Sequence, residues 1–147
     1  MTNDLTATAL APILLITANP SHPLAHLALR YAQAVLEQSS SLDDNDRTHP
    51  TSALQVFFYG EAAQTANGLR WQSADQPNLS AQWQALAEQY SLRLLVCVST
   101  ALSRGISDAD NSQRHQLTGD NLAARFELVG LGELAMMMQN GGRLMQF

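Results

Sequence analysis

Short apolar runs that alternate with segments of helical spacing restrict the fold of this chain more than any other feature. The clearest runs are residues 12–17, 54–59 and 92–98. Their length and their polar or turn-forming flanks favour buried strands over helices. Strands that alternate with helices are typical of parallel βαβ units, in which helices cover both faces of one sheet. The pattern therefore predicts an α/β fold.

The segments between these runs complete the predicted architecture. Apolar residues recur at helical spacing from Leu24 to about residue 38, and again from Asn78 or Ser80 to Tyr90. Shorter helices are expected at 61–67, 99–104 and 133–139, and further strands at 125–129 and 143–147. Together these elements predict a three-layer α/β/α sandwich with a mainly parallel sheet of about five strands.

The length of 147 residues suits a single domain. We expect residues 12–147 to form it, after a flexible lead-in at residues 1–11. Residues 39–52 are rich in Ser, Asp and Asn and contain a Pro, a composition too polar to bury. They are expected to form a surface insertion.

Charge and composition exclude several classes of function. The net charge of -5 argues against a nucleic-acid binder, which needs a basic face to neutralise phosphates. All eight basic residues are Arg, so no Lys is present for a Schiff base or a phosphate-binding P-loop. A single cysteine, Cys97, allows no disulfide within the chain and no multi-cysteine metal site.

No apolar run reaches the roughly 18–20 residues that a membrane span requires. The fairly apolar stretch 5–18 follows Asp4, lacks a basic n-region and is interrupted by Pro12, so it does not indicate a signal peptide. The expectation is a reduced, cytoplasmic location without membrane contact.

Cys97 is the first candidate for chemistry. It ends a predicted strand immediately before a helix, and ligand crevices of open α/β sheets lie at the carboxyl ends of strands. A helix N-terminus favours the thiolate. Spacing alone still favours a packing role, because a lone cysteine in an apolar strand is usually part of the core. Arg104 and His115 are weaker candidates for contacts with the thiol, and a solvated surface role is preferred for both.

Two groups of side chains resemble metal ligands only loosely. His22 and His26 are four residues apart, but Pro23 lies between them and no third ligand is near, so surface positions are preferred. Asp108, with the nearby residues 110 and 111, lacks the glycine and final Glu of a calcium loop, so helix capping is the better interpretation. No metal is expected.

Two further motifs lie near the end of the chain. Gly130 and Gly132 form an incomplete dinucleotide fingerprint, so a tight turn between strand and helix is preferred over phosphate binding. The three methionines at 136–138 suit either flexible core packing or contact with a partner subunit.

Several motifs, in this order, resemble the DsrE/TusD (DsrEFH-like) family of sulfurtransferase subunits from about Ile13 to Phe147. They are 56–59 (VFFY), 66–67 (AN), 83–86 (WQAL), 97–105 (CVSTALSRG), 121–122 (NL), 126–134 (FELVGLGEL) and 146–147 (QF). The part from Ala85 to the last residue is the most specific. The lead-in and the segment 39–52 are longer than the family pattern needs.

The resemblance implies a function and partners. It implies the same sandwich fold and a persulfide carried on Cys97, which reverses the preference for packing there. It implies a heterohexamer with TusB-like and TusC-like subunits, a TusA-like sulfur donor and a TusE-like acceptor. The relay would serve 2-thiouridine formation at the wobble position of tRNA, with no cofactor and no direct binding of tRNA.

Three alternatives remain open at this point. A DsrE-type subunit of a sulfur-oxidation complex would use the same cysteine chemistry with other partners. A scaffold subunit that only binds partners would lack a cysteine at position 97. A flavodoxin-like nucleotide binder needs a phosphate loop after the first strand, where residues 18–23 contain two prolines and no glycine.

Overall fold

A computed structural model of the protein describes residues 10–42 and 53–147. Within them, five parallel strands form one sheet in the order β4-β3-β2-β1-β5. The strands are β1 (Ile13–Ile16), β2 (Gln55–Phe58), β3 (Leu94–Cys97), β4 (Phe126–Val129) and β5 (Leu144–Gln146). The predicted α/β/α sandwich with a parallel five-stranded sheet is confirmed.

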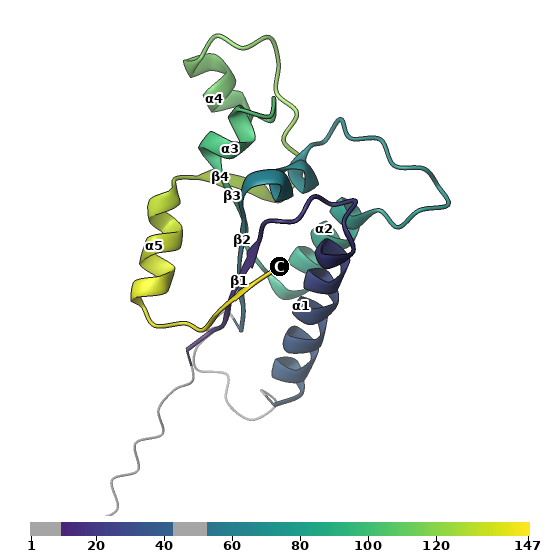
Figure 1. The fold of residues 1–147 in the computed structure, drawn as a ribbon, viewed down its shortest axis with the longest axis vertical. Helices are drawn as coiled ribbons and strands as arrows, with labels where there is room; N and C mark the ends of the chain where they lie inside the picture. Colours follow the sequence, from purple (N-terminus) through teal and green to yellow (C-terminus); the bar gives the residue numbers. More distant parts are fainter. Residues whose placement is uncertain (1–9, 43–52) are drawn as a thin grey trace, which may run out of the picture.

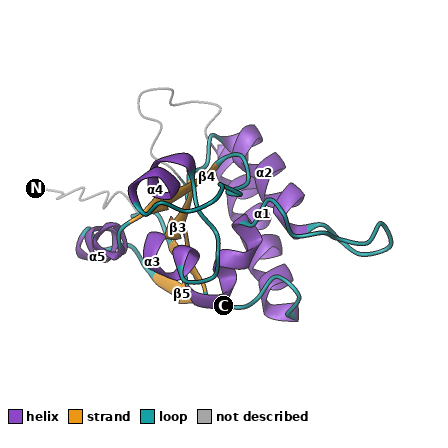
Figure 2. Ribbon diagram, turned by 90° about the horizontal axis from the view of Figure 1, so that it is seen from above, coloured by secondary structure: helices purple, strands orange, loops and turns teal. Residues whose placement is uncertain are grey.

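The helices divide between the two faces and the carboxyl edge of the sheet (Figures 1 and 2). Helices α1 (Pro23–Leu42) and α2 (Leu79–Tyr90) cover one face, and α5 (Leu131–Gln139) lies on the other. The 3-10 helix η2 (Gly60–Ala66) and the short helices α3 (Val98–Leu102) and α4 (Ala109–Arg114) follow the carboxyl ends of β2 and β3. The carboxyl edge therefore carries short, closely connected elements.

The two faces of the sheet bury different amounts of apolar surface. On the α1 and α2 face, Leu94 and Val96 of β3 join a large cluster that includes Phe58 and Trp83. Side chains alternate along a strand, so the residues between them point the other way, toward α5. There the buried cluster is small: Phe57, Leu95 and Cys97.

Helix α1 differs from the sequence prediction because it continues to Leu42 instead of ending near residue 38. The hydroxyl groups of Ser39, Ser40 and Ser41 donate hydrogen bonds to backbone carbonyls within the preceding turn. Serines placed in this way can extend a helix although their composition is typical of a loop. Most of the predicted insertion, residues 43–52, and most of the predicted lead-in, residues 1–9, lie outside the described residues.

A polar clip joins the loops at the carboxyl edge. The Asn121 amide donates to the side-chain oxygen of Asn67 and to the Gly105 carbonyl, each at 3.0 Å, and accepts from the Ser107 N–H at 2.9 Å. Gly68 donates its N–H to the Asn121 carbonyl at 2.6 Å, and a Cβ atom at Gly68 would lie only 2.7 Å from that oxygen. The clip therefore fixes the chain after β2 and β3 and on the way into β4.

Candidate functional site

Cys97 is the last residue of β3, a strand with neighbours on both sides. It pairs with Val129 of β4 and stands directly before the first residue of α3. The residue is only 1% exposed. The thiol therefore lies at the carboxyl edge, where the sequence places it, but beneath the surface.

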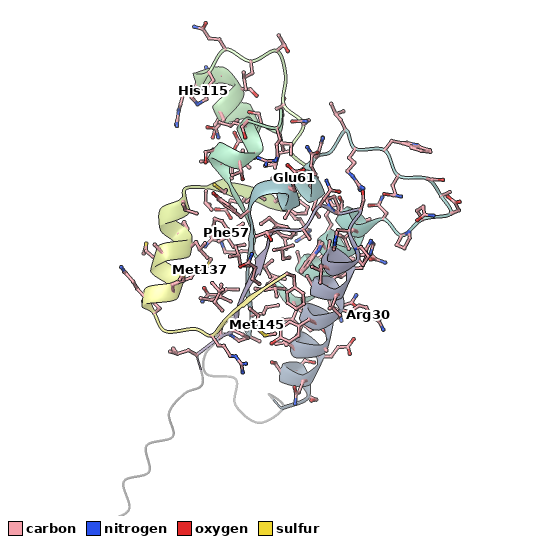
Figure 3. The ribbon with its side chains drawn as sticks, viewed as in Figure 1. Arg30, Phe57, Glu61, His115, Met137 and Met145 are labelled. Atoms are coloured by element: carbon pink, nitrogen blue, oxygen red, sulfur yellow. The ribbon has the colours of Figure 1, made fainter. Side chains whose placement is uncertain are left out.

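Apolar side chains surround the thiol, some from the sheet and some from helix α5. Phe57 and Leu95 are its buried neighbours, and Leu134 and Met137 of α5 pack against this cluster. Figure 3 labels Phe57 on the sheet and Met137 on α5. An anion in such surroundings is costly unless hydrogen-bond donors reach it.

Hydrogen-bonding groups reach the cysteine from the first turn of α3. The Sγ atom lies 3.3 Å from the Ser99 hydroxyl oxygen. The Thr100 hydroxyl donates to the Cys97 carbonyl oxygen at 3.2 Å. The turn thus directs polar groups toward both the side chain and the backbone of Cys97.

Burial and these groups act in opposite directions on the Cys97 thiol. Burial raises the pKa of the thiol, while the hydroxyl and backbone N–H groups of Ser99 and Thr100 together lower it by more. Donors that face the sulfur favour the thiolate over the thiol. The net result is a pKa below the ordinary value of a cysteine.

Arg104 makes its hydrogen bonds and its ion pair away from the sulfur. Its guanidinium binds the Glu61 carboxylate of η2 with N–O distances of 2.9 and 2.8 Å, and it donates to the Thr100 carbonyl at 3.1 Å. The side chain therefore ties η2 to the end of α3. The structure does not bring it into hydrogen-bonding contact with Cys97 among the described residues.

His115 is exposed and follows the last residue of α4. Figure 3 shows it at the outer end of the molecule, far from Phe57 and Met137, which belong to the cluster around the thiol. The structure thus gives His115 no place beside the sulfur. The surface role preferred from the sequence agrees with this position.

The loosely metal-like residues have structural roles. The His22 Nδ1 atom accepts the Leu24 N–H at 3.1 Å, at the start of α1. Asp108 caps α4, because its carboxylate accepts the Asn111 N–H at 2.8 Å, which confirms the capping interpretation. Over residues 10–42 and 53–147, no three His, Cys, Asp or Glu side chains gather to hold a metal ion.

Gly130 and the methionines belong to the α5 layer. Gly130 alone separates β4 from α5, which confirms the tight turn. The helix starts at Leu131, two residues earlier than predicted, so Gly132 lies inside it. Met137 faces the cluster around Cys97, whereas Met136 and Met138 are 59% and 53% exposed.

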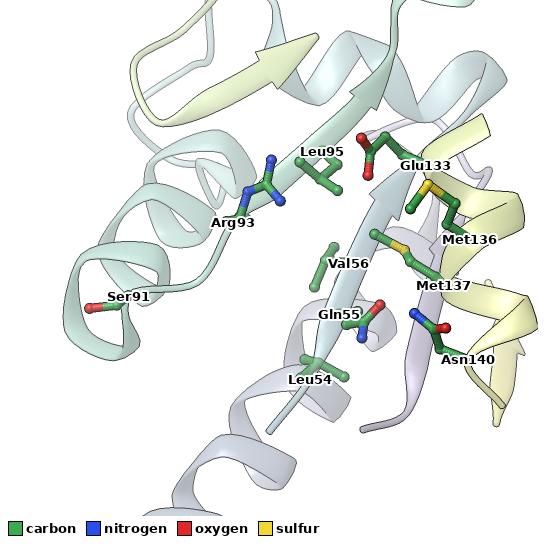
Figure 4. A pocket seen from close by; sticks show the side chains of 10 residues that line it. All are labelled: Leu54, Gln55, Val56, Ser91, Arg93, Leu95, Glu133, Met136, Met137 and Asn140. Carbon is green, nitrogen blue, oxygen red and sulfur yellow. The ribbon is translucent and has the colours of Figure 1, made fainter. Parts of the chain in front are cut away.

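A cavity of about 330 Å³ lies between α5 and the strands β2 and β3. Figure 4 shows Arg93 and Leu95 on the sheet side, and Glu133 and Met137 on the helix side. Leu95 and Met137 also belong to the cluster around Cys97. The space beside the thiol cluster is therefore incompletely filled.

The chain belongs to the DsrE/DsrF-like family, which matches residues 12–147. Individual relatives carry more specific names than the family does. A protein of Vibrio parahaemolyticus named sulfurtransferase TusD homolog is 37% identical over 84% of this chain and 86% of its own length. Sulfurtransferase TusD of Proteus mirabilis is 38% identical over 82% of this chain and 84% of its own. These relatives identify sulfur transfer as the activity class.

A solved structure supports the fold alone. The crystal structure of the YchN protein of E. coli superposes with a TM-score of 0.67 at 20% identity, over 94% of this chain and 100% of that one.

Within the described residues, no helix is both long and apolar enough to cross a membrane.

Ser99 is the residue near the thiol that sequence reasoning missed. The available signal was its position two residues after Cys97, inside the same motif that suggested the helix start. Position alone could not show whether the hydroxyl turns toward the sulfur or toward solvent. That depends on the direction in which α3 leaves β3.

Proposed function

We propose that the protein is a subunit of a sulfur relay and carries the transferred sulfur as a persulfide on Cys97. The observation that carries the proposal is the thiol itself: a single cysteine at the carboxyl edge, with hydrogen-bond donors that favour its thiolate. Membership of the DsrE/DsrF-like family and the TusD names of its relatives support the same chemistry.

The proposed step is an exchange between sulfur atoms. The Cys97 thiolate attacks the outer sulfur of a donor persulfide, a new S–S bond forms, and the donor leaves as a thiolate. Cys97 then carries the outer sulfur, which a second thiolate removes in the same way. Each step conserves electrons, so no external oxidant or reductant is needed. A general base is not required when the attacking thiol already ionises readily.

The finer assignment names donor, acceptor and product. A TusA-like carrier supplies the sulfur, and a TusE-like protein receives it for 2-thiouridine formation at the tRNA wobble position. The net charge of -5 supports a role without direct contact to tRNA. A cytoplasmic location is part of the proposal, because a single free thiol stays reduced in that compartment.

The proposed assembly is a heterohexamer with TusB-like and TusC-like subunits. Leu131, Met136 and Met138 on α5 are each at least half exposed, and exposed apolar side chains of this kind favour contact with another protein surface. Residues 12–147 are proposed to enter this assembly as one domain.

Intact-mass spectrometry tests the central claim. The chain is incubated with a cysteine desulfurase, cysteine and a TusA-like carrier, alone and with the partner subunits present. We expect a gain of about 32 Da, one sulfur atom, on the wild-type chain. Cys97→Ser should gain nothing, because a hydroxyl of similar size cannot form a persulfide.

Two controls make this result decisive. The carrier must itself be shown to hold sulfur, and Cys97→Ser must unfold at the same denaturant concentration as the wild type. Sulfur retained on Cys97→Ser, or a wild-type chain that stays unloaded beside a loaded carrier and all partner subunits, would contradict the proposal.

A further inference from the structure

The thiol and the hydroxyl beside it differ sharply in exposure. Cys97 is 1% exposed, while Ser99 lies on the surface only two residues further along. The other neighbours of the thiol are apolar side chains of the sheet and of α5. Among the side chains in contact with the thiol, Ser99 is thus one that also reaches the surface.

We propose that Ser99 is a positioning residue for Cys97: its hydroxyl donates a hydrogen bond to the ionised sulfur, and its side chain covers the approach to that sulfur. The covering role rests on the proposed sulfur relay. The hydrogen bond does not, since it concerns the thiol whatever its substrate.

The direction of the hydrogen bond follows from the charge state. With a neutral thiol, either the sulfur or the Ser99 oxygen could donate across the 3.3 Å between them. A thiolate has no proton, so only the Ser99 hydroxyl can then donate. Hydrogen bonds to an ionised acceptor are about twice as strong as neutral ones. The contact therefore strengthens when the thiol ionises.

The neighbouring hydroxyls have other partners. Thr100 donates to the Cys97 carbonyl oxygen at 3.2 Å, and Ser103 donates to the Thr100 carbonyl at 3.1 Å. Both hold the turn of α3 in place. Ser99 is thus the hydroxyl that lies 3.3 Å from Sγ, and it lowers the pKa of the thiol more than the Thr100 hydroxyl does.

No charged side chain of the described residues is among the groups that shift the pKa of Cys97. Arg93 and Glu127 pair at 2.8 Å, and Arg104 pairs with Glu61. Glu133 lies in the first turn of α5, beside the cavity. The groups that shift the pKa of Cys97 are instead the hydroxyl and N–H groups of Ser99 and Thr100, together with burial. The effect of Ser99 is therefore separable from these charges.

The test is the pH dependence of alkylation of the full chain by iodoacetamide, followed by intact mass. Only the thiolate reacts, so the midpoint of the rate against pH reports the pKa of Cys97. Ser99→Ala removes the donor, and we expect the rate at pH 7, relative to the plateau at high pH, to fall about three- to tenfold. The plateau itself should rise, because the smaller side chain uncovers the sulfur.

Two variants serve as matched controls. Ser99→Thr keeps a hydroxyl at the same position and should restore the wild-type midpoint. Ser103→Ala removes a hydroxyl at the C-cap of the same helix, away from the sulfur, and should leave both midpoint and plateau unchanged. A simple loosening of α3 would shift the plateau in Ser103→Ala as well.

An unchanged midpoint in Ser99→Ala would overturn the hydrogen-bond claim, and an unchanged or lower plateau would overturn the covering claim. Neither result depends on sulfur loading, which is measured separately by the gain in mass. The failure of Ser99 as a positioning residue and the failure of the sulfur relay are therefore distinguishable.

Discussion

The two faces of the sheet differ in how completely their side chains are packed. The α1 and α2 face holds a continuous cluster in which Phe58 meets the rings of Trp83 and Phe126 edge-on, at 5.4 and 5.5 Å between ring centroids. The α5 face holds Cys97 in a small cluster, next to a cavity of about 330 Å³. All nine residues of α5 are described, and none of them is buried.

We infer from this difference that one face of the sheet supplies most of the stability, while the other face holds the thiol. Stability comes mainly from area removed from water and from close packing, which the α1 and α2 face supplies. A cysteine that exchanges sulfur with other proteins, as proposed for Cys97, would be out of their reach on that face. The α5 face encloses the thiol while leaving the helix above it lightly held, and the following variants test that comparison.

The largest effect is expected at Phe58, which is 0% exposed and central to the well-packed face. Phe58→Ala should lower the free energy of unfolding by about 3–5 kcal/mol, because it leaves a cavity among rings that cannot collapse. Urea denaturation measures the change. A loss below about 1 kcal/mol would show that this face is not the main source of stability.

Phe57 provides the matched comparison, since it is the adjacent residue, is equally buried and points to the opposite face. Phe57→Ala should cost about 3 kcal/mol, at the lower end for such a change, because α5 can settle into the space. The same denaturation experiment decides. Equal losses for Phe57→Ala and Phe58→Ala would remove the distinction between the faces.

Met137 tests how α5 covers the thiol. Met137→Ala should cost only about 1–2 kcal/mol, since the residue is only partly buried, and it should increase the alkylation rate of Cys97 at high pH. Met138→Ala, on the exposed side of the same helix, is the control and should change neither quantity. If Met137→Ala leaves the alkylation rate unaltered, α5 does not limit access to the sulfur.

The smallest effect is expected for Arg104, whose ion pair with Glu61 belongs to neither face. The two side chains are 27% and 58% exposed, so solvent screens their attraction. Arg104→Gln should change the free energy of unfolding by less than about 1 kcal/mol and leave the alkylation midpoint of Cys97 in place. A clear shift of that midpoint would return Arg104 to the site.

The sequence predicted the sheet well because buried parallel strands leave a local signal. The run 54–59 is apolar apart from Gln55, and β2 lies within that run. The end of α1 was missed because serines that bond to helix carbonyls look like loop residues in composition. Packing density on the α5 face has no local signal at all, since it depends on residues from four strands and one helix.

The candidate site was predictable only in outline. The position of Cys97 at the carboxyl edge followed from the strand and helix pattern, and its role as a sulfur carrier stays a prediction. The contact with Ser99 depends on the backbone path at the junction of β3 and α3, which spacing does not determine. Asn67 and Asn121, noticed as parts of a family pattern, proved to be partners in one clip.

Because side chains alternate along β3, the sulfur of a cysteine in this strand lies on one face of the sheet or on the other. Leu95 and Cys97 face α5, and Val96 faces the α1 and α2 core. Moving the cysteine by one position would enclose the sulfur between the sheet and two long helices, with no gradual intermediate. An insertion or deletion within this strand would therefore move the sulfur to the other face of the sheet and could not change its exposure by small steps. As such proteins evolve, the exposure of the sulfur can change in small steps only through the loops and helices around the strand.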